Sequence, residues 1–169
     1  MRIRRATGDD AATVAAIQVR SWRAAYAGLM PQEYLDSLSI PDRAARWREW
    51  IDSLPGGVRV WLAEESEGPV GFASTGPSRD SEPVPGTAEV YALYLEPSVI
   101  GTGRGRELFG HAVDDLRAQG YQRAELWVLT GNDRAQRFYE RAGWLADGSE
   151  KLEPFDEIVV PEVRYWIEL

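Results

Sequence analysis

Cysteine is absent from this chain of 169 residues, and histidine occurs once, at position 111. The lack of cysteine excludes a disulfide framework, a thiolate metal site and a cysteine nucleophile. One histidine and scattered carboxylates also lack the spacing of a dedicated metal site, so no metal is predicted. Lysine is nearly absent too, because Lys151 is the only lysine among 19 basic residues. His111 lies at the edge of a helical apolar stripe and is not predicted to act in catalysis.

Basic residues are also fewer than acidic ones, with 19 Lys and Arg against 27 Asp and Glu. The formal net charge is -8 and the sequence pI is about 4.8. Nucleic acids and anionic membranes are bound by basic surfaces, so neither is predicted as a partner, while a cationic substrate is mildly favoured. The chain contains no run of 18 apolar residues, and no apolar signal core follows its basic start. We therefore expect a cytoplasmic protein without a membrane segment.

The length and composition are typical of one globular domain, with 44% hydrophobic and 27% charged residues. Since domains usually contain roughly 100–200 residues, we predict a single domain over residues 1–169. The apolar periodicity predicts the order strand, two or three helices, three strands, helix, strand, helix, two strands. This order predicts an α/β three-layer fold, in which a mixed central sheet of about seven strands is flanked by helices.

The individual elements follow from local patterns. Alternating apolar residues predict strands at residues 2–5, 58–63, 70–74, 88–95, 123–129, 144–150 and 158–168. Helical spacing predicts helices from a capping box at Thr7–Asp10 to near Gly28, and then at 32–38, from Pro41-Asp42 to 54, at 104–119 and at 133–142. Residues 76–87 are rich in Pro, Gly and Ser and predict a mobile loop.

A glycine-rich turn joins the strand at 88–95 to the following helix. It reads Gly101-Thr102-Gly103-Arg104-Gly105-Arg106. Alternate glycines let the backbone approach a ligand closely and adopt positive φ. Amides that continue into a helix N-terminus attract anionic groups, and Arg104 and Arg106 add contacts to phosphate oxygens. The turn therefore predicts a phosphate cradle, with a plain strand-to-helix turn as the alternative interpretation.

A Rossmann dinucleotide site is a further alternative for this turn. The fingerprint that begins Gly101-x-Gly103 requires a third glycine at position 106, where the chain has Arg106. No acidic residue closes a following strand at the expected place, unless Glu125 takes that role. The Rossmann interpretation is therefore disfavoured.

A second segment lies about 25 residues downstream, after the strand at 123–129. It reads Asn132-x-x-Ala135-x-x-Phe138-Tyr139-x-x-x-Gly143-Trp144. Together the two segments resemble the GNAT superfamily of acetyl-CoA-dependent N-acetyltransferases: the turn resembles their pyrophosphate motif, and the second segment resembles their next core motif. The resemblance covers residues 88–145 closely and the remaining element order more loosely. One departure is Ile100, where relatives often carry Gln or Arg before the first glycine.

The resemblance implies a binding site for acetyl-CoA, which leaves as coenzyme A. The backbone of Leu93, Tyr94 and Leu95 would hold the pantetheine arm and polarise the thioester carbonyl, while the turn at 101–106 binds the pyrophosphate. Asn132 would hydrogen-bond the pantetheine arm, although asparagine is also among the best helix N-cap residues. Tyr139 would protonate the departing thiolate, because a phenol has a pKa near that of a thiol; the alternative is a packed aromatic residue.

The general base is implied less specifically. Glu89 lies early in the strand that leads to the turn and is the first candidate, with Glu125 on the next strand as the second. Glu89 could instead be an ordinary charge that solvates a strand end. Trp22 and Tyr26, one helical turn apart, and the loop at 76–87 are predicted to form the acceptor pocket, although the aromatic pair could simply pack the helix onto the sheet.

The leading hypothesis is therefore an N-acetyltransferase that moves an acetyl group from acetyl-CoA to a primary amine of a small molecule or peptide. No nucleophile suggests an acyl-enzyme, so direct transfer in a ternary complex is expected. The alternative is a non-catalytic acyl-CoA-binding regulatory module of the same fold. A propionyl or longer acyl group, and a homodimer formed through the C-terminal strands, are further possibilities.

Overall fold

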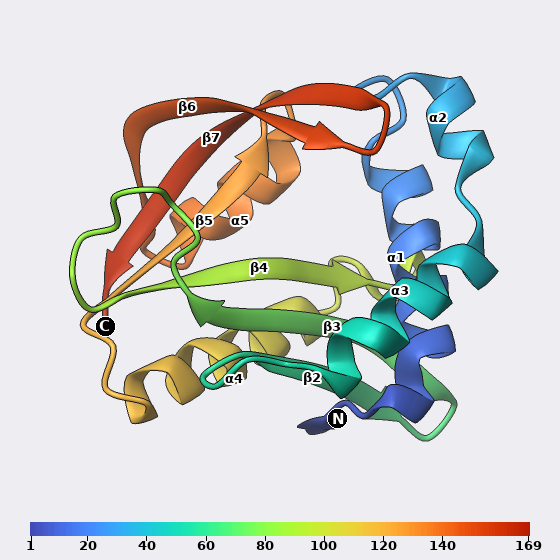
Figure 1. Cartoon of the computed structure of the whole chain (residues 1–169), viewed down its shortest axis with the longest axis horizontal. Helices are drawn as coiled ribbons and strands as arrows, with labels where there is room; N and C mark the ends of the chain where they lie inside the picture. Colours follow the sequence, from blue (N-terminus) through green and yellow to red (C-terminus); the bar gives the residue numbers. More distant parts are fainter.

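The structure, a computed structural model, describes residues 1–169. They form a seven-stranded sheet, in the order β1-β2-β3-β4-β5-β7-β6, and five α-helices (Figure 1). Neighbouring strands are antiparallel except β4 and β5, which are parallel. The predicted mixed sheet of about seven strands is confirmed.

The element boundaries follow the sequence periodicity closely. The strands are β1 (Arg2–Arg5), β2 (Arg59–Glu65), β3 (Gly68–Pro77), β4 (Thr87–Leu95), β5 (Arg123–Leu129), β6 (Leu145–Phe155) and β7 (Ile158–Glu168). The helices are α1 (Ala11–Ala25), α2 (Gln32–Ser37), α3 (Ile40–Asp52), α4 (Arg104–Ala118) and α5 (Asp133–Arg141), with single 3₁₀ turns at Gly8–Asp10 and Pro97–Val99. The capping box is present, since the Asp10 carboxylate accepts the Thr7 N–H at 2.8 Å.

Strand β6 is longer than predicted, because it continues from residue 150 to Phe155. The added residues include Pro154, which opposes Val159 of β7. Proline cannot donate to a sheet ladder, and its presence argues against a strand at sequence level. β6 is the edge strand of the sheet, where a missing N–H can face outward without loss. The edge position, which the sequence does not reveal, explains the difference.

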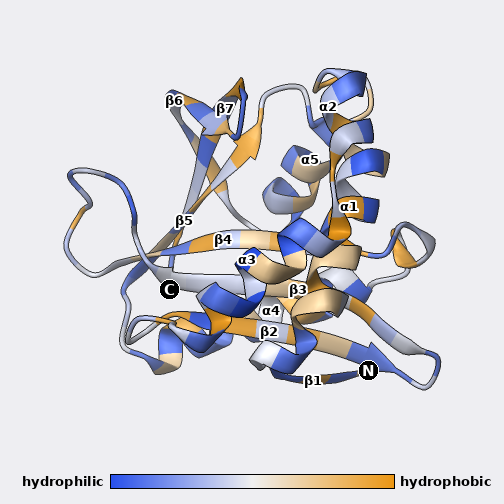
Figure 2. Ribbon diagram, turned by 45° about the vertical axis from the view of Figure 1, so that its right-hand side comes forward, coloured by the Kyte–Doolittle hydropathy of each residue, from blue (hydrophilic) through white to orange (hydrophobic).

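Helices cover both faces of the sheet, which confirms the predicted three layers. α1 and α3 pack on one face, in a core that includes Leu62 of β2. α4 packs on the other face, in a core that includes the adjacent Ala63. Successive strand residues point to opposite faces, so this pair separates the two cores. Figure 2 shows hydrophobic colours concentrated on the central strands β2 to β4.

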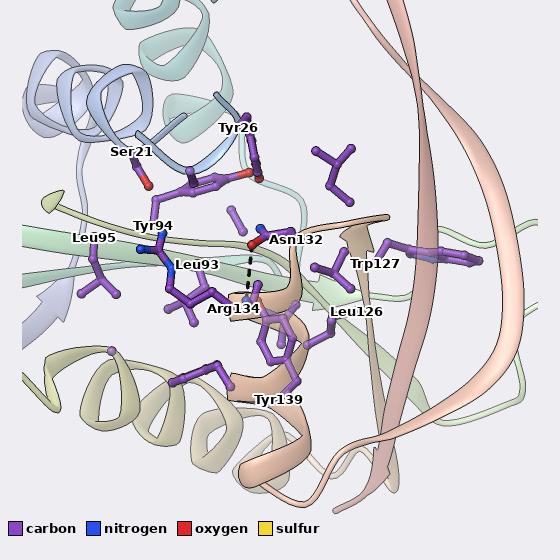
Figure 3. Close-up of a pocket in the computed structure, with 18 of the residues that line it drawn as sticks. Ser21, Tyr26, Leu93, Tyr94, Leu95, Leu126, Trp127, Asn132, Arg134 and Tyr139 are labelled. Atoms are coloured by element: carbon purple, nitrogen blue, oxygen red, sulfur yellow. Dashed lines mark hydrogen bonds between the residues drawn. The ribbon is translucent and has the colours of Figure 1, made fainter. Parts of the chain in front are cut away.

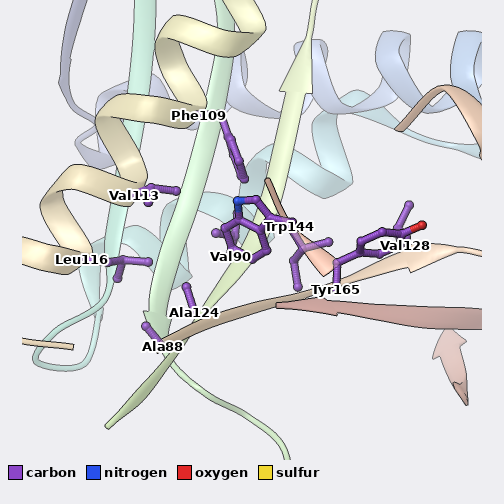
Figure 4. Packing of buried hydrophobic residues seen from close by; sticks show 10 residues of the cluster. Ala88, Val90, Phe109, Val113, Leu116, Ala124, Val128, Trp144 and Tyr165 are labelled. Carbon is purple, nitrogen blue, oxygen red and sulfur yellow. The ribbon is translucent and has the colours of Figure 1, made fainter. Parts of the chain in front are cut away.

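The largest buried cluster fixes α4 against β4, β5 and β7 (Figure 4). Its members are Ala88, Val90, Phe109, Val113, Leu116, Ala124, Leu126, Val128, Trp144 and Tyr165. The rings of Phe109 and Trp144 lie 5.3 Å apart between centroids. Burial of each large apolar side chain contributes about 1.5–3 kcal/mol, so the cluster anchors α4 with its N-terminus near the end of β4.

Strands β4 and β5 separate along their length. They are paired only from Thr87 to Val90 of β4, opposite residues 123–126 of β5. The pairing of β4 with β3 shifts register at Tyr91, which lies between the partners of Thr75 and Ser74. Such a bulge bends its strand and increases local twist. Beyond the bulge, the backbone of residues 91–95 has no partner on the β5 side, and this opening forms the site described next.

Candidate active site

A cavity of about 530 Å³ occupies the opening between β4 and β5 (Figure 3). Its walls come from α1, β4, the glycine turn, β5, α5 and the β6–β7 hairpin. The predicted site residues that line it are Tyr26, Glu89, Leu93, Tyr94, Leu95, Gly101, Gly103, Gly105, Arg106, Asn132 and Tyr139. Trp22, Thr102 and Arg104 do not line it. The fold therefore brings most of the predicted residues, from four separate segments, into one cavity.

The glycine turn has the backbone geometry of an anion cradle. Gly101 and Gly103 have φ angles of 82° and 89°, which side chains other than glycine rarely adopt. Their N–H groups donate to no backbone carbonyl in the turn, and the next two amides precede the first intrahelical bonds of α4. A Cβ atom at Gly105 would lie 2.8 Å from Leu95 Cδ1, so glycine there allows α4 to approach β4. Unpaired amides and a helix N-terminus together suit a phosphate group.

Thr102 and Arg104 turn away from the cavity. The Thr102 hydroxyl donates to the Val99 carbonyl oxygen, and the Arg104 guanidinium donates to Glu65 Oε1 at 2.9 Å. Arg104 also donates to the carbonyl oxygen of Thr102. Arg104 therefore holds the turn against the β2–β3 hairpin, while Arg106 lies in the cavity wall. The two predicted phosphate-binding arginines therefore have different surroundings.

Three arginines of α5 join Arg106 in the cavity wall. They are Arg134, Arg137 and Arg141, and none of the four forms an ion pair. Positions separated by three or four residues share one helix face. The α5 arginines were not predicted as site residues, although their spacing after Asn132 indicates one shared helix face. They give this acidic protein a local cationic region beside the glycine turn.

Tyr139 and Asn132 enter the cavity from α5. Tyr139 packs against Phe109, with 5.5 Å between ring centroids, and burial raises the pKa of its phenol well above the usual value. The group is therefore protonated at neutral pH and able to donate. Asn132 caps α5, since its Oδ1 accepts the Ala135 N–H at 3.3 Å (Figure 3). The expected N-cap role of Asn132 is confirmed.

Trp22 and Tyr26 have different positions despite their adjacent helical turns. The Trp22 side chain is buried and packs edge-on against Tyr26 and Phe155, at 5.4 and 5.3 Å between centroids. The Arg43 guanidinium covers its ring at 4.8 Å. Tyr26 reaches the cavity, and burial followed by its proximity to Tyr94 raises its phenol pKa. Trp22 thus packs against Tyr26 outside the cavity lining, while Tyr26 itself lines the cavity.

Glu89 is buried, with 1% of its surface exposed, and its carboxylate is already paired. The Arg79 backbone N–H donates to Glu89 Oε2 at 2.9 Å, and the Arg79 guanidinium binds both carboxylate oxygens. The same guanidinium lies 4.1 Å from the centre of the Tyr91 ring. The first candidate base is therefore held in an ion pair with Arg79, which was not predicted from the sequence.

Glu125 lies beside Glu89 on β5 but outside the cavity lining. It accepts a hydrogen bond from the Ser78 hydroxyl, and burial raises the pKa of its carboxyl group. Asp80 accepts from Trp127 Nε1 at 3.1 Å and pairs with Arg164 at 2.7 Å. The first residues of the loop predicted at 76–87 are therefore tied to the sheet through side chains.

Glu162 of β7 is another carboxylate in the cavity wall, and it was not predicted from the sequence. It lies opposite Leu129 of β5 and Lys151 of β6. Burial raises the pKa of its carboxyl group to about 7, against the lowering effect of Lys151. Its spacing of two residues from the buried Val160 was the available signal, because that spacing places a carboxylate on an inward-facing strand position.

Other features lie outside this cavity. His111 packs against Trp61, with 4.5 Å between ring centroids, on α4 away from the cavity lining. No group of three or more His, Asp or Glu side chains is arranged to hold a metal ion. No helix combines the length and apolar character needed to cross a membrane.

The fold and the cavity define the class of this protein. A seven-stranded sheet that opens between β4 and β5, beside a glycine turn at the start of α4, corresponds to the predicted acyltransferase architecture. The sequence model of the acetyltransferase (GNAT) family matches residues 19–144. The chain belongs to this family, whose members are acetyl-CoA-dependent N-acetyltransferases. The predicted family, fold and enzyme class are confirmed.

A sequence relative agrees with the family assignment, and two solved structures share the fold. An uncharacterized N-acetyltransferase of Bacillus subtilis is 34% identical over 131 residues, which cover 77% of this chain and 72% of the relative. A GCN5-related N-acetyltransferase structure from Rhodopseudomonas palustris superposes with a TM-score of 0.78 at 21% identity, covering 99% of this chain and 95% of the other. The PaiA N-acetyltransferase from Thermoplasma acidophilum, solved with coenzyme A, has a TM-score of 0.71 at 21% identity, covering 99% and 98%.

Proposed function

We propose that the chain transfers an acetyl group from acetyl-CoA to a primary amine of a small molecule or peptide, by direct transfer in a ternary complex. The observation that carries this proposal is the continuity of one cavity. It extends from the unpaired amides of the glycine turn, past Tyr139, to the carboxylates on β4 and β7. An anionic cofactor and a cationic amine can therefore occupy its two ends together.

Three groups of residues fit the cofactor. The turn at Gly101 and Gly103 offers amides to the pyrophosphate, and the arginines of α5 offer charge to the phosphates. The backbone of Leu93 to Leu95 has no strand partner on the β5 side, so it can hold the pantetheine arm as an added strand would be held. Asn132 and Tyr139 line the opposite wall. Binding of coenzyme A to the PaiA structure of the same fold supports this site.

The chemistry follows from the same residues. Acetyl-CoA supplies the acetyl group, activated as a thioester. A backbone amide of residues 93–95 polarises the carbonyl oxygen, since preorganised donors stabilise developing negative charge. The Tyr139 hydroxyl donates a proton to the leaving sulfur, and its raised pKa keeps that proton in place at neutral pH. The cavity holds no cysteine, so no thiol nucleophile competes with direct attack by the amine.

The test combines binding and turnover. We expect acetyl-CoA to bind in calorimetry, and free thiol to be released when a panel of aliphatic monoamines, polyamines, amino acids and peptide amides is added. Tight binding with no thiol release across the whole panel would support the regulatory module instead. Absence of binding would reject both functions. The net charge of -8 predicts that cationic amines will be the better acceptors in the panel.

A further inference from the structure

The three carboxylates in the cavity wall differ in what already binds them. Glu89 accepts hydrogen bonds from the Arg79 backbone and guanidinium. Glu153 pairs with Lys151 Nζ at 2.9 Å. Glu162 accepts no side-chain hydrogen bond, and its nearest cation is Lys151 Nζ at 3.7 Å. Of the three, Glu162 is the most loosely paired, because Lys151 lies beyond hydrogen-bond distance of its carboxylate and much nearer to Glu153.

The position of Glu162 suits contact with a reacting amine. It opposes Leu129 at the far end of β5, three residues before Asn132. It lines the same cavity as Tyr26 and Tyr94, and its charge contributes to the raised phenol pKa of both. The side chain is 11% exposed, which leaves a route to the cavity. Glu125, by contrast, lies under Ser78 and outside the lining.

We propose that Glu162, rather than Glu89, binds the ammonium form of the acceptor and takes its first proton. This inference rests on the proposed N-acetyltransferase function. It makes Glu162 a catalytic residue, while Glu89 anchors the loop through Arg79. A carboxylate already committed to a guanidinium is a poor proton acceptor, because protonation would break the pair.

The proton balance of the reaction assigns each group a step. Glu162 takes one proton from the ammonium, which leaves a neutral amine with a free electron pair. That pair forms the new C–N bond at the acetyl carbon as the C–S bond breaks and its electrons move to sulfur. Tyr139 gives its proton to the sulfur and regains one from the nitrogen. Glu162 then releases its proton to water, so one proton leaves per acetyl group transferred.

The charged groups around Glu162 set the pH at which it can act. Lys151 and Arg79 lower its pKa, whereas Glu153 and Glu89 raise it, and burial exceeds them all. The resulting value of about 7 lies close to neutral pH. A general base works best with a pKa near the operating pH, because it is then both deprotonated and basic enough. The electrostatic surroundings agree with the role that the geometry assigns.

The test compares the isosteric variants Glu162→Gln and Glu89→Gln with Glu157→Gln, an exposed position on the turn of the same hairpin. Thiol release is measured from pH 5.5 to 9 with the best acceptor of the panel. We expect Glu162→Gln to lower kcat/KM about 100-fold or more and to abolish its rise with pH. The acetyl-CoA affinity of Glu162→Gln, measured by calorimetry, should stay within about twofold of the wild-type affinity. The kcat/KM of Glu157→Gln should match the wild-type value at each pH. Near-ultraviolet circular dichroism reports folding, and Glu162→Asp, which keeps the carboxylate, should recover part of the activity.

A second readout is independent of turnover. In protein labelled with ¹³C at the glutamate carboxyl carbons, one resonance should titrate with a midpoint near pH 7, and Glu162→Gln should remove it. The inference is overturned if Glu162→Gln keeps the rising limb, above all if Glu89→Gln loses it. That result leaves the proposed function intact. If the wild-type protein binds acetyl-CoA but acetylates no amine, the proposed function and this inference both fail.

Discussion

The backbone N–H of Arg79 donates to the Glu89 carboxylate at 2.9 Å, and the guanidinium of the same residue binds that carboxylate as well. One residue therefore neutralises a side chain that is almost fully buried on β4. The pairing also ties the start of the loop after β3 to the cavity wall. A buried charge without a partner is costly, so Arg79 has a structural role beside the site.

Replacement of Arg79 should destabilise the fold. Arg79→Ala leaves Glu89 with a single backbone donor, and we expect a loss of about 1–3 kcal/mol in the free energy of unfolding at pH 7. Urea denaturation measures it. Arg48→Ala is the control, because Arg48 pairs with Asp9 on the open surface and its loss should change stability by less than about 1 kcal/mol. Equal midpoints for the two variants would contradict the buried ion pair.

The glycine turn can be tested against a matched glycine on the same helix. Gly103 and Gly120 flank α4, and both have a φ of 89° and open space where a Cβ would lie. Gly103→Val and Gly120→Val should therefore share a similar backbone strain of about 1–2 kcal/mol. Only Gly103→Val should weaken acetyl-CoA binding, measured by calorimetry, because a side chain there obstructs the phosphates. Similar affinities for both variants would exclude the cradle.

The cationic face of α5 predicts a salt-sensitive contribution to cofactor affinity. Arg134→Ala and Arg137→Ala should each weaken acetyl-CoA binding by about three- to tenfold and flatten its dependence on ionic strength. Arg117→Ala, at the far end of α4 and outside the cavity lining, should leave the affinity unchanged. If the α5 variants bind acetyl-CoA like the wild type at low salt, these arginines do not face the phosphates.

Tyr139 should act on the rate and not on binding. Tyr139→Phe keeps the ring that packs on Phe109 and removes the proton donor. We expect kcat to fall about 10- to 100-fold, with acetyl-CoA affinity nearly unchanged. Phe138→Leu is the matched control for packing, since it alters the neighbouring ring without touching the hydroxyl. An unchanged kcat in Tyr139→Phe would remove Tyr139 from the mechanism.

The Lys151–Glu162 pair predicts a shift in the pH dependence. The Lys151 ammonium, 3.7 Å from Glu162, lowers the pKa of that carboxyl group. Lys151→Gln removes the charge, so the pKa of Glu162 should rise above about 7. A base acts only above its pKa, and the rising limb of kcat/KM should therefore move to higher pH. Lys151→Arg keeps the charge and should leave the midpoint in place. A downward shift in Lys151→Gln would contradict the assignment.

Several features of this protein could be predicted from the sequence because they depend on local order along the chain. The turn at 101–106 needs its glycines where the backbone has positive φ, and Asn132 needs only the amide three residues later. The periodicity of α1 and α4 likewise reflects the face that each helix buries. Patterns of this kind span only a few residues, so the family and the layers of the fold were predictable.

The tertiary structure decided which groups bind each carboxylate. Three different strands carry the same side chain, in Glu89, Glu125 and Glu162. Their availability depends on groups brought by the loop after β3 and by the β6–β7 hairpin, and above all on Arg79 and Lys151. These groups are placed by the bulge in β4, by the edge position of β6 and by the path of the loop after β3. The two-residue spacing from Val160 placed Glu162 at an inward-facing strand position, but the groups that bind its carboxylate depend on long-range packing, which leaves no periodic trace in a single sequence.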